Sequence, residues 1–201
     1  FILSWIFKFM TITINYKNNV PKKDSYNLVL FIDEKYNISS LKKYVLSSEY
    51  SYIFDLLKTN DLKKKIISFD INSKKKIILI SLKQNLASSD AENLGAKFYD
   101  ILKNNKQTEY CVNSDTTIGK LKNVVGYFLH GLKLKSYSFE KYKSKKNKKN
   151  FFITVIGKHK PALKDQIKFR AIEEGTFYAR DLVSEPGNIL HPDEYAKRIS
   201  Y

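Results

Sequence analysis

The chain has 201 residues, of which 43% are hydrophobic, and a formal net charge of +16 at pH 7. This length suffices for one domain and part of another. The charge favours anionic partners, but only three of the 36 basic residues are arginine, which specific phosphate and base recognition prefers. The single cysteine, Cys111, excludes an internal disulfide framework and a cysteine-rich zinc site. We therefore expect a cytoplasmic protein.

Residues 1–9 form an apolar stretch, FILSWIFKF, which is far shorter than the ~20 residues of a membrane-spanning helix. The stretch also lacks the basic region and the cleavage site of a signal peptide. We interpret Met10 as the natural start and residues 1–9 as a non-native or disordered leader, and we expect no membrane partner. A short anchor on a membrane surface is the alternative.

Strand patterns recur along the whole chain. Alternating residues or short apolar runs predict strands at residues 11–16, 27–32, 66–71, 75–83, 109–113 and 151–157. A short polar turn separates 66–71 from 75–83, which predicts a hairpin.

Helical spacing of apolar residues predicts helices between these strands. The first covers residues 48–58, and the second begins at a Ser88 or Ser89 cap. Asp115 is expected to cap a third helix that continues to residue 132, and a fourth helix runs from residue 162 until Pro186 and Gly187 stop it. Pro192 opens a last helix.

Because strands and helices alternate, we expect an α/β fold. Its sheet is mostly parallel or mixed, with helices on both faces, and a long helix follows it. Two glycines inside the third predicted helix, Gly126 and Gly131, are expected to permit close packing of that helix on the sheet.

Catalytic motifs are absent from the sequence. It contains no HExxH, no GxSxG, no GxxxxGK[ST] and no GxGxxG pattern. The three histidines, His130, His159 and His191, lie far apart in unlike surroundings, and a packing or surface role is expected for His130. The sequence therefore assigns no catalytic residue and no metal ligand within these 201 residues.

Two segments resemble the leucyl aminopeptidase (cytosol aminopeptidase) family. In the first segment, residues 126–146, the matching positions are Gly131, Leu134, Tyr137, Phe139, Tyr142 and Lys143. In the second segment, residues 171–199, they are Gly175, Ala179, Arg180, Asp181, Leu182, Val183, Pro186, Asn188, Leu190 and Pro192. The two segments occur in the family's order, with strand 151–157 between them.

Two positions depart from the family pattern, and Gly187 stands where a small residue is common. Ser184 replaces the common Asn, and His191 replaces the usual Thr. Because His is a poorer helix cap than Thr, we expect a looser start to the last helix.

The resemblance implies an N-terminal macro-domain-like domain at 10–160, a linker helix at 161–186, and the start of a truncated catalytic domain at 187–201. It implies a homohexameric enzyme that cleaves peptide substrates with two divalent metals, Mn or Zn, held downstream of these residues. This chain would bind no metal itself and would have no peptidase activity.

Binding of DNA through a lysine-rich surface is the alternative function. Some family members bind DNA with this domain, and the lysine-rich loop at 141–149 offers phosphate contacts at Lys145, Lys146, Lys148 and Lys149. We expect the aromatic residues interleaved with lysines, Tyr137, Phe139 and Tyr142, to pack against the core and not to contact nucleic acid. Nucleotide binding at a macro-type cleft is a third possibility, although a glycine-rich phosphate loop is lacking.

Overall fold

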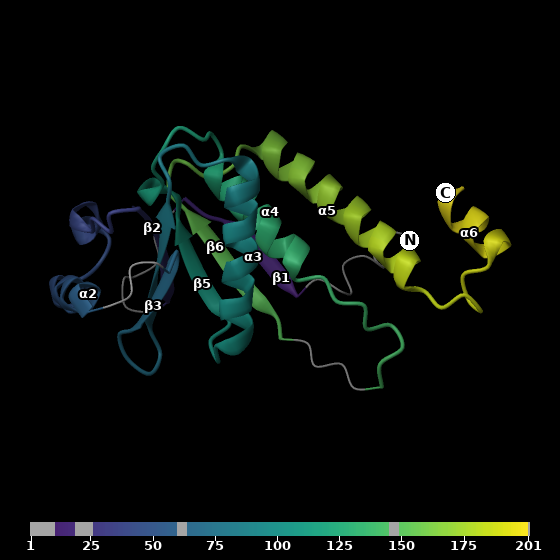
Figure 1. Cartoon of the computed structure of the whole chain (residues 1–201), viewed down its shortest axis with the longest axis horizontal. Helices are drawn as coiled ribbons and strands as arrows, with labels where there is room; N and C mark the ends of the chain where they lie inside the picture. Colours follow the sequence, from purple (N-terminus) through teal and green to yellow (C-terminus); the bar gives the residue numbers. More distant parts are fainter. Residues whose placement is uncertain (1–10, 19–25, 60–63, 145–148, 201) are drawn as a thin grey trace.

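The computed structural model describes residues 11–18, 26–59, 64–144 and 149–200 (Figure 1). Residues 1–9, interpreted above as a leader, lie outside the described residues. Six strands form one sheet in the order β1-β6-β5-β2-β4-β3. The strands are β1 (Ile12–Tyr16), β2 (Asn27–Asp33), β3 (Ile66–Asp70), β4 (Lys76–Leu82), β5 (Glu109–Asn113) and β6 (Phe151–Ile156). Only the β3–β4 pair is antiparallel, which confirms the expected hairpin and the mostly parallel sheet.

Helices cover both faces of this sheet, as predicted. The structure has α2 (Ser47–Thr59), α3 (Ser88–Asn104), α4 (Val124–Lys135), α5 (Leu163–Ser184) and α6 (Pro192–Ile199). Two 3-10 turns, η2 (Ser39–Lys43) and η3 (Ser114–Thr116), complete the described elements. One core lies between the sheet and α3 and α4, and a second lies under η2 and α2.

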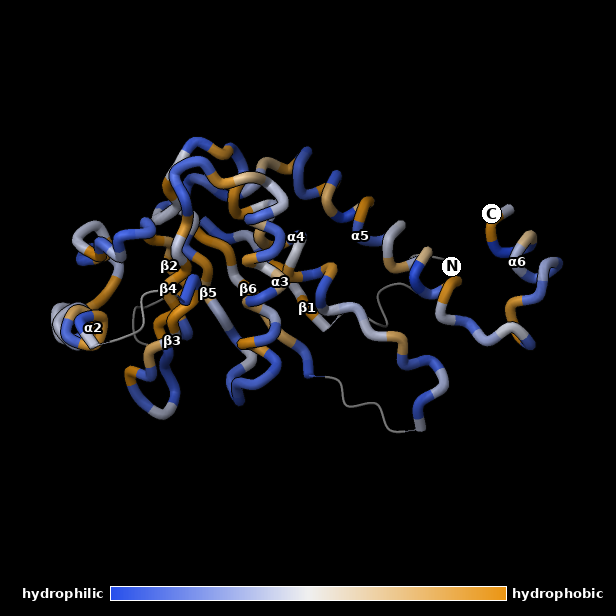
Figure 2. The backbone as a smooth tube through the Cα atoms, viewed as in Figure 1, coloured by the Kyte–Doolittle hydropathy of each residue, from blue (hydrophilic) through white to orange (hydrophobic). Residues whose placement is uncertain are grey.

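The central strands are buried on both sides, which explains their continuous apolar runs. In β2, Val29 and Phe31 point into the core beneath α3 and α4, whereas Leu28 and Leu30 point into the other core. Figure 2 shows hydrophobic residues concentrated in the strands.

Glycines allow α3 and α4 to approach each other closely. A Cβ atom on Gly131 would overlap the backbone carbonyl of Glu92 in α3, and one on Gly95 would overlap that of Phe128 in α4. A Cβ atom on Gly126 would lie 2.7 Å from the Phe169 ring of α5. The expectation of helix–sheet packing at Gly126 and Gly131 was therefore wrong, because both glycines face other helices.

Two predicted helix starts were also wrong. The third helix begins at Val124 and not at Asp115, because Gly119 and Asn123 adopt positive φ angles of 91° and 60° that a right-handed helix cannot contain. Asp115 instead accepts a hydrogen bond from the backbone N–H of Lys158 at 2.6 Å.

The second wrong helix start is that of α3, which was predicted to begin at a capping serine, Ser88 or Ser89. The N-cap of α3 is Ala87, whose carbonyl accepts the bond from Ala91 at 3.1 Å. Ser88 and Ser89 consequently lie inside the first turn of the helix.

The long helix α5 lies against α4 and extends beyond it, away from the sheet (Figure 1). Much of the apolar spacing that predicted this helix faces outwards, since Ile167, Ile172 and Tyr178 are 60%, 44% and 41% exposed. Within the part of the chain that the structure describes, no helix combines the length and apolarity needed to cross a membrane.

Candidate functional site

The two family-like segments meet where α5 passes the end of α4. The hydroxyl of Tyr137 donates a hydrogen bond to Asp181 Oδ1 at 2.8 Å, and its ring centroid lies 5.5 Å from that of Phe177. Arg180 donates from Nη1 to the carbonyl of Leu134 at 2.7 Å, and its guanidinium carbon lies 5.5 Å from the centre of the Tyr137 ring. Burial, together with the hydrogen bond to Asp181, raises the pKa of Tyr137 to about 12. We call this arrangement the junction.

Glu185, the residue that follows α5, joins three segments at the junction. Its carboxylate accepts hydrogen bonds from Lys141 and Tyr142 and from Arg198 Nη1, the last at 3.1 Å, and its side chain is only 2% exposed. Burial alone would raise the pKa of Glu185, but these hydrogen bonds outweigh it and lower the pKa to about 2. Glu185 therefore remains ionised at neutral pH and connects the loop after α4 to α6.

A tight turn brings α6 back towards α5. The carbonyl of Pro186 accepts hydrogen bonds from the backbone N–H groups of Ile189 and Leu190, each at 2.9 Å. Tyr178 of α5 then donates to the carbonyl of Arg198 at 2.6 Å.

The opening of α6 is where the sequence predicted it. Pro192 occupies the first turn, and His191 is the N-cap and makes no side-chain capping bond.

Only part of the family-like set takes part in the junction. Gly175 has open space around it, and Ala179 and Val183 are exposed. The Nζ atom of Lys143 lies 3.9 Å from Oε1 of Glu140, outside the junction. The other members are either half-buried or exposed, namely Leu182, Leu190, Pro186 and Asn188. Phe139 packs edge-on against the Tyr142 ring, with centroids 5.8 Å apart.

Several residues of the site were missed by the sequence reasoning. They are the partners Lys141, Glu185 and Arg198, and Glu173, which pairs with the buried His130. The only sequence signal for any of them was the i,i+4 spacing of Glu194 and Arg198, which pair at 3.0 Å. The other contacts join residues more than ten positions apart in the sequence. The i,i+3 and i,i+4 pairing rules for side chains on one helix do not predict such contacts.

The described residues contain no group of three or more His, Cys, Asp or Glu side chains that could hold a metal ion. His130 and Glu173 form a pair at 3.1 Å, but Lys133 lies 3.2 Å from the same carboxylate. The lysine ammonium would repel a bound cation, so this pair does not fit a divalent metal. Cys111 is buried, and burial raises the pKa of its thiol to about 12, so this cysteine packs in the core and does not fit a nucleophile.

Three of the lysines suggested for nucleic-acid contact, Lys145, Lys146 and Lys148, lie outside the described residues. Lys149 donates a hydrogen bond to the carbonyl of Asn105 and lies 5.3 Å from the centre of the Phe151 ring. Lys149 is therefore engaged within the chain, and no contact among the described residues favours the DNA-binding alternative.

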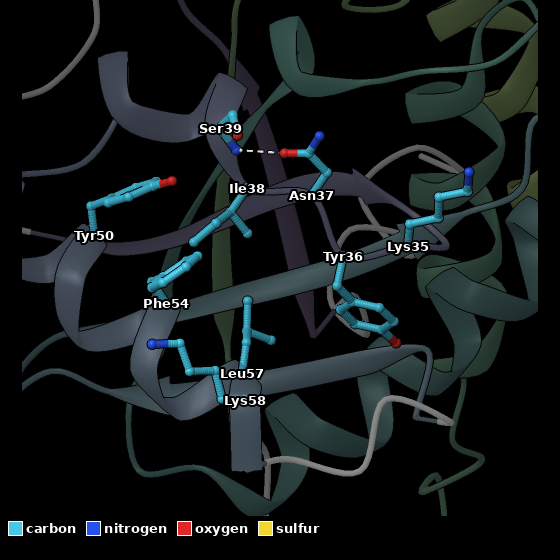
Figure 3. Close-up of a pocket in the computed structure, with 9 residues that line it drawn as sticks. All are labelled: Lys35, Tyr36, Asn37, Ile38, Ser39, Tyr50, Phe54, Leu57 and Lys58. Carbon is cyan, nitrogen blue, oxygen red and sulfur yellow. Dashed lines mark hydrogen bonds between the residues drawn. The ribbon is translucent and has the colours of Figure 1, made fainter.

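A small pocket of about 200 Å³ lies between the loop after β2 and α2 (Figure 3). Ile38 and Leu57 are buried in it, and the rings of Tyr50 and Phe54 stack beside them with centroids 6.3 Å apart. Its volume is below the roughly 300 Å³ at which ligand pockets usually begin. The lining contains no histidine, carboxylate or cysteine, so we assign it no catalytic role.

The fold and the junction define a class: an α/β domain from which a long helix leads into a second, short helix. No protein-family model matches the chain. Among curated proteins, a probable cytosol aminopeptidase of Clostridium perfringens is 29% identical over 194 residues, covering 91% of this chain and 36% of that protein. A probable cytosol aminopeptidase of Methylobacterium radiotolerans is 37% identical over 81 residues, covering 37% of this chain and 16% of that protein.

Solved structures share the same fold. A variant of tomato leucine aminopeptidase matches 96% of this chain and 42% of its own with a TM-score of 0.72 at 18% identity. The cytosol aminopeptidase of Coxiella burnetii matches 92% of this chain and 36% of its own, with a TM-score of 0.60 at 14% identity. The bottromycin maturation enzyme BotP in complex with Mn matches 88% of this chain and 35% of its own, with a TM-score of 0.62 at 12% identity.

These matches confirm the resemblance to the leucyl aminopeptidase (cytosol aminopeptidase) family. The chain spans about a third or less of the length of the two curated relatives described above.

Proposed function

We propose that residues 10–160 form the non-catalytic N-terminal domain of a leucyl aminopeptidase, which removes N-terminal amino acids from peptides. Residues 161–186 are its linker helix, and residues 187–201 begin the catalytic domain. The junction carries this proposal, because it brings together residues of the two family-like segments, such as Tyr137 and Asp181. The alignment with the Clostridium relative over 91% of the chain supports it.

We assign this part of the protein a positioning role and no chemistry. The described residues do not fit a two-metal centre, so the two divalent ions of the whole enzyme, Mn or Zn, would be held by other residues. Peptide substrates and assembly into a homohexamer belong to the same proposal for the whole enzyme. A cytosolic location is supported by the names of the curated relatives.

Hydrolysis of leucine p-nitroanilide tests the proposal. We expect the purified 201-residue protein to show no turnover in the presence of added Mn²⁺ or Zn²⁺. The Clostridium relative, assayed in parallel, serves as the positive control. Turnover that exceeds the no-protein background and co-purifies with the chain would overturn the assignment of a non-catalytic domain.

A further inference from the structure

Glu173 is the one buried residue of α5, a helix of 22 residues. Its side chain is 4% exposed, whereas apolar residues of the same helix, such as Ile167 and Ile172, are 60% and 44% exposed. A helix that docks by hydrophobic burial shows the opposite distribution. The contact between α5 and the domain therefore centres on a carboxylate.

Two side chains of α4 hold this carboxylate. His130 Nδ1 lies 3.1 Å from Oε1, and Lys133 Nζ lies 3.2 Å from Oε2. The histidine is buried and the Lys133 side chain is 14% exposed, so all three groups are largely removed from water. The Glu173 carboxylate also affects Tyr16 of β1. The pKa of Tyr16 is raised to about 12, mainly by burial and secondly by the nearby negative charge of Glu173.

Aromatic contacts flank Glu173 at equal spacing along α5. Phe169, four residues before it, packs on the rings of His130 and Tyr127 at centroid distances of 5.1 and 5.3 Å. Phe177, four residues after it, packs on Tyr137 at 5.5 Å. The side of α5 that faces α4 thus presents a Phe-Glu-Phe series at a spacing of four residues.

This series alternates aromatic and carboxylate side chains along the contact. If α5 slid by four residues, roughly 6 Å along its axis, Glu173 would occupy the place of Phe169 and Phe177 would occupy the place of Glu173. Glu173 would then lose its pairing with His130 Nδ1 and Lys133 Nζ, and its carboxylate would occupy a site lined by aromatic rings. An unpaired buried carboxylate is strongly unfavourable, so Glu173 disfavours this shifted register.

We propose that Glu173 is a positioning residue that fixes the axial register of α5 on α4. Buried ion pairs contribute little net stability compared with apolar replacements, but they specify one arrangement over others. The inference rests on the proposed linker role, because the register of α5 determines where α6 and any following chain lie.

A distance measurement between two spin labels tests this proposal. Lys103→Cys on α3 and Lys197→Cys on α6 provide exposed labelling sites, and the native Cys111 is too buried to react. Double electron–electron resonance on the labelled protein should give one narrow distance. In Glu173→Leu we expect a broadened distribution or a second population displaced by up to roughly 6 Å. Glu173→Gln, which keeps the side-chain size, should change the distance distribution in the same way.

The matched control is Glu174→Gln, at the neighbouring position that pairs with Arg170 at 2.8 Å, and it should leave the distance unchanged. Narrow distance distributions like that of the wild type in both Glu173 variants would overturn the proposal. A lower melting temperature with unchanged distances would overturn it too, because Glu173 would then add stability without fixing the register. The labels report register without any peptidase reaction, so the result is independent of the activity assay described above.

Discussion

Replacing Glu185 by Gln tests whether charge holds the junction together. Its carboxylate accepts hydrogen bonds from Lys141, Tyr142 and Arg198, and these lower its pKa from the ordinary 4.5 to about 2. A difference of that size corresponds to roughly 3 kcal/mol. Because the side chains of Lys141 and Arg198 are 29% and 26% exposed, solvent screens part of this energy, and we expect about 1–2 kcal/mol.

Hydrogen exchange of α6 measures this loss, since the junction opens locally before the domain unfolds. A loss of 1–2 kcal/mol corresponds to exchange about 5- to 30-fold faster in α6 of Glu185→Gln. Amides of β4 in the sheet should keep their wild-type protection. Asp100→Asn removes an exposed carboxylate that pairs with Lys135 at 3.9 Å, and it is the control that should leave α6 unaffected.

The depressed pKa of Glu185 sets the direction of the pH dependence. Because the folded-state pKa of Glu185 is depressed, its contribution is fully present above pH 4.5 and is lost as the pH falls towards about 2. After correction for intrinsic exchange rates, the protection of α6 in the wild type should fall over this range, and that of Glu185→Gln should stay nearly flat. Equal protection in both proteins at pH 6 would refute the reasoning.

The remaining predictions concern the helices. Gly131→Ala should lower the melting temperature by about 5 °C in calorimetry, because its methyl group would overlap the Glu92 carbonyl. Gly175→Ala, which meets open space, should instead stabilise α5 by about 1 kcal/mol, so a loss of stability would contradict it. Replacing the exposed Leu163 and Ile167, which lie one helical turn apart, together by Asp should reduce any concentration-dependent self-association in sedimentation experiments, and unchanged association would exclude this face as its cause.

Local patterns predicted the sheet and most of the helices, because strand and helix periodicities are encoded in neighbouring residues. The start of α4 was missed since the positive φ of Asn123 depends on how the loop after β5 packs. The apolar spacing of α5 correctly predicted a helix, but not that Glu173 would be its buried residue, because the partners His130 and Lys133 lie about forty positions earlier.

The junction illustrates the same limit. The resemblance singled out Tyr137, Arg180 and Asp181, and the structure brings them together. It gave no sign of Glu185, whose significance comes from Lys141 and Arg198 on separate segments. Opposite charges are too common in a lysine-rich chain for such a pairing to be read from the sequence.

A chimera tests the central claim most directly. Residues 11–200 would replace the segment of the Clostridium perfringens relative that aligns with them, and the purified chimera would be assayed for leucine p-nitroanilide hydrolysis with added Mn²⁺. If these residues are the N-terminal domain and linker of an aminopeptidase, the chimera should fold and retain activity within about tenfold of its parent. A folded chimera with no activity would contradict the account.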